Sequence, residues 1–121
     1  MRAAWLVLLA LGGACGAPSP ASVTAEVSCV PEASVLRQRC TVRLSDRRTG
    51  RAVEGATVTL TADMPAMPLA HSVPPVTATP GNRPGTYQGA LELEMTGRWV
   101  VAIRVQGPVN DQLTHTLDVS P

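Results

Sequence analysis

Two methionines and a histidine are the residues of this chain whose types and spacing could do chemistry. Met64 and Met67 lie three positions apart, each is followed by proline, and His71 comes four positions after Met67. Thioether and imidazole groups are ligand types that suit cuprous copper. A residue before proline is held extended, and a polyproline-type segment repeats every three residues, so both thioethers would point to one side. The stretch is therefore a candidate Cu(I) site, with Met95 as a further candidate ligand.

The same methionines could instead pack in a hydrophobic core, which is the more common role of methionine in proteins. Met64 continues the alternation of Leu60 and Ala62, and this favours an inward-facing side chain at that position. The sequence leaves copper binding and core packing open as alternatives for the loop.

The start of the chain has the composition of an export signal. Residues 1–14 begin with a single charge, continue with a short apolar run and end in small residues, and the run is too short to span a bilayer. Small residues before Cys15 also resemble a bacterial lipobox, in which cleavage precedes the cysteine and lipid is attached to its sulfur. We expect residues 1–14 to be a signal peptide of lipoprotein type and residues 15–21 to be a flexible tether.

This reading of the first residues predicts a place in the bacterial cell envelope. With lipid on Cys15 the protein would be anchored to the membrane and face the periplasm, and the anchor would be its only membrane contact. With ordinary signal cleavage a little further on, the protein would be soluble in the periplasm.

Composition limits both the core and the partners. Beyond residue 21 the only aromatic residues are Tyr87 and Trp99, which we expect to anchor a core of Val, Leu, Ile and Ala. All ten basic residues are arginine and face nine acids, so no charge excess suggests nucleic acid or adhesion to a membrane surface. The chain has no nucleophile elbow, zinc-hydrolase histidine pair or phosphate-binding glycine loop, so we expect a binding module and no enzyme.

Cys29 and Cys40 remain as a pair if Cys15 carries lipid. An exported protein with one remaining pair most simply forms a disulfide. A thiolate metal site is the alternative, but an oxidising compartment disfavours free thiols and the spacing is wide for a zinc knuckle. Both cysteines share the parity of the apolar residues around them, so we expect the disulfide to face the core.

Alternation of apolar and polar residues predicts an all-β fold. Runs with this period of two, which marks strands with one buried face, occupy residues 23–29, 40–45, 56–63, 91–95, 99–105 and 113–119. We expect Thr96-Gly97 to form a tight hairpin, and prolines to keep residues 64–76 out of any central strand. About seven short strands in one domain over residues 22–121 are typical of an immunoglobulin-like β-sandwich.

The order of these features resembles a known family. Residues 55–68 read GATVTLTADMPAMP, residues 84–87 read PGTY, and residues 91–101 read LELEMTGRWVV. Over roughly residues 38–106 the chain is similar to the YtkA-like domain, which is related to the FixH-type proteins of the bacterial envelope. In that family a strand ending in a Met-Pro-x-Met loop precedes a Gly-x-Tyr strand and a Met-x-Gly-x-Trp hairpin.

The resemblance implies a β-sandwich, an envelope location and a link to copper or heavy-metal handling. Members often carry histidine directly after the Met-x-x-Met element, whereas three residues intervene before His71 here. Two function classes follow. The first is a metal-binding module that holds or relays Cu(I) through the Met-Pro-x-Met loop. The second is a structural or interaction module without metal, accessory to an envelope transporter or oxidase complex.

Overall fold

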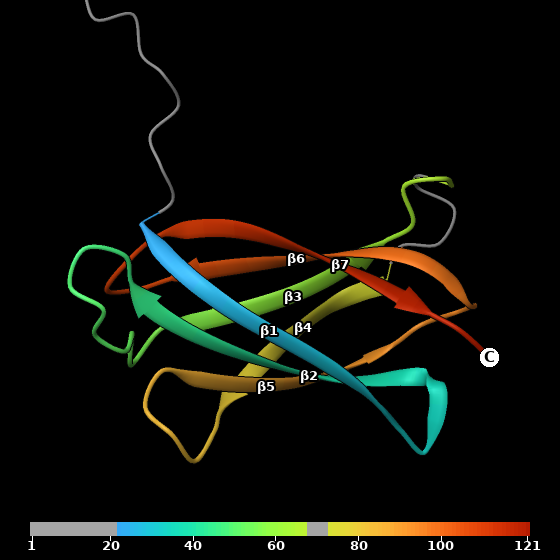
Figure 1. The fold of residues 1–121 in the computed structure, drawn as a ribbon, viewed down its shortest axis with the longest axis horizontal. Helices are drawn as coiled ribbons and strands as arrows, with labels where there is room; N and C mark the ends of the chain where they lie inside the picture. The colour runs from blue at the N-terminus through green and yellow to red at the C-terminus, as the bar shows by residue number, and fades with distance from the viewer. Residues whose placement is uncertain (1–21, 68–72) are drawn as a thin grey trace, which may run out of the picture.

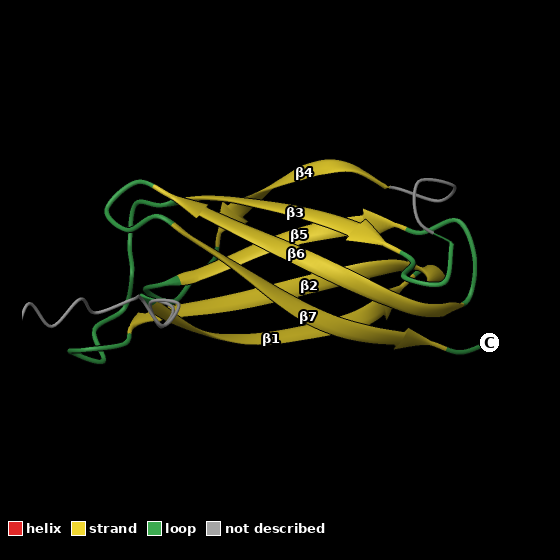
Figure 2. Ribbon diagram, turned by 90° about the horizontal axis from the view of Figure 1, so that it is seen from above, coloured by secondary structure: helices red, strands yellow, loops and turns green. Residues whose placement is uncertain are grey.

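The computed structural model describes residues 22–67 and 73–121, and these residues form seven antiparallel β-strands. They are β1 (Val23–Glu32), β2 (Ser34–Asp46), β3 (Thr57–Asp63), β4 (Val73–Pro80), β5 (Thr86–Glu92), β6 (Gly97–Gln106) and β7 (Asp111–Val119). Strands and loops make up all of this part of the chain (Figure 2), so the all-β prediction is confirmed. Within these ranges, nothing has the length and apolar character of a membrane-crossing helix.

The strands pack in two layers that join into one nearly closed sheet, with the order β1-β2-β5-β4-β3-β6-β7. In Figure 1, β3 and β6 run through the upper half and β2 and β5 through the lower half. β4 connects the layers, because it pairs with β3 along most of its length and with β5 only at Thr79 and Pro80. The edge strands meet where the N–H groups of Ser22 and Val23 donate to Asp111 Oδ2, at 2.7 and 3.2 Å. The predicted sandwich is confirmed.

Each layer turns one face inward, as the alternation along the strands requires. The largest fully buried side chains are Trp99, Leu44, Leu60, Leu91 and Ile103. Burial of an aliphatic side chain of this size contributes about 1.5–3 kcal/mol to stability. Trp99 also satisfies its indole N–H, which donates to the carbonyl oxygen of Met95 at 3.0 Å. The expected anchoring role of Trp99 is confirmed.

Tyr87 is the second predicted aromatic anchor, and its side chain is buried. Its hydroxyl donates to the carbonyl oxygen of Val53 at 2.8 Å and accepts the N–H of Ala56 at 3.2 Å. Both partners lie in the connection between β2 and β3. Tyr87 therefore fastens that connection to β5 from within the core.

β4 contradicts the expectation that residues 64–76 avoid any central strand. Val73–Pro80 forms a strand that stands between β3 and β5 in the sheet order. The sheet tolerates Pro74 and Pro75 because they lie at a register shift of the β3–β4 ladder, where neither has a partner in β3, and away from the two residues of β4 that pair with β5. The prolines thus restrict which part of β4 pairs on both sides, and they do not abolish the strand.

The connection through Thr96-Gly97 is not the tight hairpin that was predicted. β5 pairs with β2 and β4, whereas β6 pairs with β3 and β7, so the two strands belong to different layers. Residues 93–96 therefore cross from one layer to the other. Leu93 is buried in this crossover, and its N–H donates to the carbonyl oxygen of Leu36 at 2.7 Å. Met95 lies in the crossover and not on a strand.

Cys29 and Cys40 form the predicted disulfide. They stand directly opposite each other in the β1–β2 ladder, with their Cα atoms 4.0 Å apart. Cys40 is fully buried and Cys29 is half-buried, so the bond lies on the core side of these strands, as expected. The crosslink ties the edge strand β1 to its layer.

Candidate metal site

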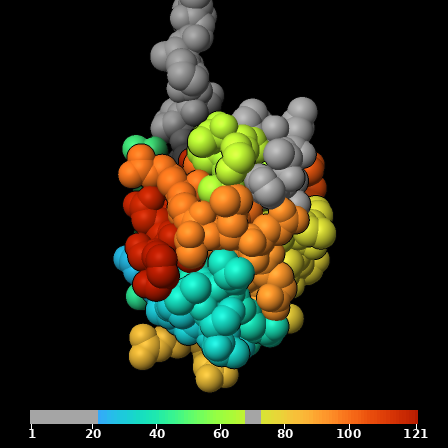
Figure 3. All heavy atoms as spheres, turned by 90° about the vertical axis from the view of Figure 1, so that its right-hand side faces the viewer, coloured from blue at the N-terminus to red at the C-terminus, as the bar shows by residue number. Residues whose placement is uncertain are grey.

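Three methionines gather at one end of the sandwich. Met64 and Met67 follow β3, and Met95 lies in the crossover between β5 and β6. The two segments touch, because a Cβ added at Gly97 would stand only 2.8 Å from Met64 Cε. Figure 3 views this end of the molecule and shows the yellow-green atoms that follow β3 beside the orange atoms of the crossover. The fold thus brings together two segments that are about 30 residues apart in the sequence.

Met64 is part of the hydrophobic core, with only 5% of its surface exposed. Its burial follows from the parity of β3, because Leu60 and Ala62 also point inward. Its carbonyl oxygen accepts the N–H of Met67 at 3.1 Å, which closes a tight turn directly after the strand. Met64 therefore packs in the hydrophobic core, which is the alternative to copper binding that its parity favours.

Met67 and Met95 differ from Met64 in being accessible, because each has 37% of its surface exposed. The backbone of each is held in place: the N–H of Met67 is bonded to Met64, and the carbonyl of Met95 is bonded to the indole of Trp99. Two partly exposed methionines therefore stand at fixed backbone positions at the same end of the sandwich.

His71, the predicted third ligand, lies outside the described residues, and so does Cys15, the predicted lipidation site. Of the four predicted metal ligands, the structure accordingly places Met64, Met67 and Met95, and it brings their segments together.

The predicted ligands that the structure describes at this end are all thioethers. Within residues 22–67 and 73–121, no three His, Cys, Asp or Glu side chains are grouped closely enough to hold a metal ion. Thioethers do not titrate and are soft ligands, which match cuprous copper better than zinc or calcium. Of the three described methionines, Met67 and Met95 are the exposed ones.

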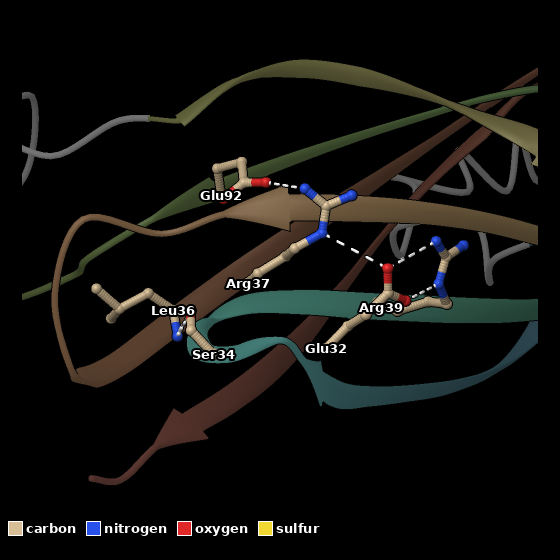
Figure 4. A network of polar contacts seen from close by, with 6 residues as sticks. All are labelled: Glu32, Ser34, Leu36, Arg37, Arg39 and Glu92. Carbon is tan, nitrogen blue, oxygen red and sulfur yellow. Dashed lines mark hydrogen bonds and ion pairs between the residues drawn. The ribbon is translucent and has the colours of Figure 1, made fainter.

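A charged network occupies the outer face of the β1-β2-β5 layer (Figure 4). Arg37 pairs with Glu92 and approaches Glu32 at 3.6 Å, while Arg39 binds Glu32 through two nitrogens. The hydrogen bond from Arg39 is the main reason that the pKa of Glu32 lies below its ordinary value of 4.5. These ion pairs could not be foreseen from the sequence, because they become visible only once the register of β1, β2 and β5 is known.

Comparison with known proteins identifies the family. No curated protein and no solved structure is significantly similar to the chain. The sequence profile described as YtkA-like matches residues 19–104. The match covers β1 to β5 and most of β6, and it includes both methionine segments. The match begins at residue 19, earlier than the resemblance seen in the sequence, and it therefore includes both strands that the disulfide joins, β1 and β2. The chain therefore belongs to the YtkA-like family.

Proposed function

We propose that this protein works in the bacterial envelope and holds or relays Cu(I) at the methionine end of its sandwich. The observation that carries the proposal is the convergence of two methionine segments, one after β3 and one in the β5–β6 crossover. Membership of the YtkA-like family supports the envelope location. The protein would act as a binding module and not as a catalyst.

The three methionines have different roles in this proposal. Met67 and Met95 present accessible thioethers and are the ligands that meet the incoming ion. Met64 is buried against Gly97 and fixes the loop to the crossover. His71 stays the predicted third ligand, since imidazole also binds copper. A site built from neutral ligands with two accessible methionines would suit the transfer of Cu(I) to another protein, because that protein can approach the ion from the solvent side.

One observation also favours the second function class. The exposed large hydrophobic side chains of the described ranges are Val30, Met67 and Met95. Exposed methionines suit adaptable protein contacts as well as metal binding. In that case the methionine end would contact an envelope transporter or oxidase component without holding a metal.

A Cu(I) competition titration against a chromophoric chelator separates the two classes. The protein used is residues 16–121, which keep all seven strands and lack the Cys15 thiol, itself a strong Cu(I) ligand. Ascorbate, which is not a thiol, keeps copper reduced without exchanging with the Cys29–Cys40 disulfide. We expect one ion per chain, and loss of that binding when Met67 and Met95 are both replaced by leucine.

The matched control is Met64→Leu. Leucine roughly preserves the volume of methionine, so each of these substitutions should cost less than about 1.5 kcal/mol of stability. Met64→Leu should therefore leave Cu(I) binding close to that of the parent protein, whereas the Met67→Leu, Met95→Leu pair removes both accessible thioethers. If the parent protein does not compete for Cu(I), or if the double variant binds as tightly as the parent, the copper proposal is wrong.

A further inference from the structure

A groove lies on the outer face of the β1-β2-β5 layer, at the end that carries the β4–β5 loop. Its volume is about 460 Å³, and its lining comes from β1, β2, β5 and that loop. In Figure 1 the gold β4–β5 loop lies at the left, whereas the segments that carry the methionines lie at the right. The groove is therefore separate from the candidate metal site.

Four arginines belong to this layer and its loop, and they fall into two pairs. Arg37 and Arg39 are neutralised by the acids of the network in Figure 4. Arg43 and Arg83 both line the groove, and neither guanidinium has an ion pair or a hydrogen bond within the described part of the chain. Two cationic groups without a carboxylate partner thus share one depression.

The two arginines reach the groove from different elements. Arg43 lies on β2, opposite Glu26 of β1 on one side and Thr86 of β5 on the other. Arg83 lies in the β4–β5 loop, where its carbonyl oxygen accepts the N–H of Thr86 at 3.1 Å. The N–H of Gly81 donates in turn to the carbonyl oxygen of Thr86 at 2.7 Å. These bonds fix the backbone of the loop at the end of β5, beside the strand that carries Arg43.

Apart from Val27, the other residues of the lining are polar. Ser28, Thr41 and Gln88 add hydroxyl and amide groups, and Glu26 is the single acid against two arginines. The groove therefore carries one excess positive charge and several neutral hydrogen-bond donors. A guanidinium presents its N–H groups as a planar fork that matches the paired oxygens of a carboxylate or phosphate.

We propose that this groove binds a small molecule through its oxyanion group, either carboxylate or phosphate, held between Arg43 and Arg83. The volume lies within the range of small-molecule sites, roughly 300–1,000 Å³. The single excess positive charge of the groove selects an anion. This proposal is independent of copper binding, because none of the methionines lines the groove.

The test is a titration of the ¹⁵N-labelled purified protein, followed by two-dimensional NMR, with inorganic phosphate and with succinate at constant ionic strength. We expect saturable shifts of the amide signals of Thr41, Arg43, Thr86 and Gln88. Arg43→Gln and Arg83→Gln should each weaken the binding about tenfold, because each removes a charged hydrogen-bond donor. A response to phosphate alone identifies a phosphate ligand and a response to succinate alone identifies a carboxylate ligand. Either response supports the site.

Arg104→Gln is the matched control, because Arg104 is an exposed arginine on the other layer and has no ion pair with any described residue. It should bind both anions as the parent protein does. The proposal is overturned if the shifts do not saturate, if sodium chloride produces the same shifts, or if Arg43→Gln and Arg83→Gln respond like Arg104→Gln. All variants alter exposed side chains, and circular dichroism is used to check that they are folded.

Discussion

The terminal methyl of Met64 lies against the backbone of Gly97, so close that a Cβ at residue 97 would stand 2.8 Å from it. Gly97 also has a φ of +133°, a conformation that side-chain-bearing residues rarely adopt. The first residue of β6 thus has two reasons to be glycine. Through this contact the loop after β3 and the β5–β6 crossover form one packed unit.

Gly97→Ala should destabilise the protein by about 1–3 kcal/mol, because it adds backbone strain and a steric clash with Met64. Urea unfolding followed by Trp99 fluorescence measures the change. Gly107→Ala is the comparison, because Gly107 has nearly the same φ, of +132°, but the atoms nearest to an added Cβ lie 3.4 Å away, which is an ordinary van der Waals distance. It reports the conformational cost without the clash.

A double-mutant cycle with Met64→Ala isolates the clash. With the long side chain of Met64 removed, Gly97→Ala should cost at least about 0.5 kcal/mol less than in the parent protein, while the cost of the backbone strain remains. Equal costs in the two backgrounds would mean that Met64 and Gly97 do not interact.

Tyr87→Phe should destabilise the protein by about 1–3 kcal/mol, because it leaves the carbonyl of buried Val53 without its hydrogen bond. The control is Thr116→Val, which removes an exposed hydroxyl from the outer face of β7 and should stay within about 0.5 kcal/mol of the parent. Chemical denaturation measures both. Equal effects of the two substitutions would show that the hydroxyl of Tyr87 does not hold the β2–β3 connection.

Local pattern was enough to predict the disulfide and segments of β1, β2, β3, β6 and β7, but not β4. Alternation depends only on which face of a strand is buried, so it located strand segments at both ends of the chain without knowledge of their partners. The shared parity of Cys29 and Cys40 placed their bond on the core side, and the structure confirms it. The inward parity of Met64 was equally visible, since it continues that of β3.

Pairing partners could not be predicted in the same way. The alternation of Leu91 continues through Leu93 to Met95, yet the strand ends at Glu92, because Leu93 is buried in a crossover between layers. Whether a short connection is a hairpin or a crossover depends on tertiary packing that local sequence does not contain. For the same reason, the contact between Gly97 and the methionine loop and the groove near Arg43 were not foreseen.

Glu32→Gln should reduce the loss of stability that acid causes. Because Arg39 lowers the pKa of Glu32 in the folded state, the carboxylate stabilises the protein fully above its ordinary pKa of 4.5. This stabilisation disappears as the pH falls through the lowered pKa of the folded state. The unfolding free energy, measured at pH 7 and pH 3, should therefore differ less in Glu32→Gln than in the parent protein.

Part of the acid dependence should remain in that variant, because the N–H groups of Thr49 and Arg48 also lower the pKa of Asp46. Glu54→Gln is the control, since Glu54 is an exposed acid without an ion pair among the described residues, and it should follow the parent. High salt should weaken the effect of Glu32, because exposed pairs are screened. If the unfolding free energy of Glu32→Gln changed between pH 7 and pH 3 as much as that of the parent protein, the stabilising role of the Glu32 carboxylate would be contradicted.

Reduction of the Cys29–Cys40 disulfide should cost about 2–3 kcal/mol, because the bond closes a short loop in the unfolded chain. Urea unfolding with and without a phosphine reductant measures the cost. A Cys29→Ala, Cys40→Ala double variant is the control and should unfold at the same urea concentration under both conditions. The bond ties the edge strand β1 to β2, so hydrogen exchange of β1 amides should also rise on reduction, ahead of those in the central strand β3. If β1 and β3 exchange equally fast after reduction, the disulfide stabilises the whole domain and not its edge.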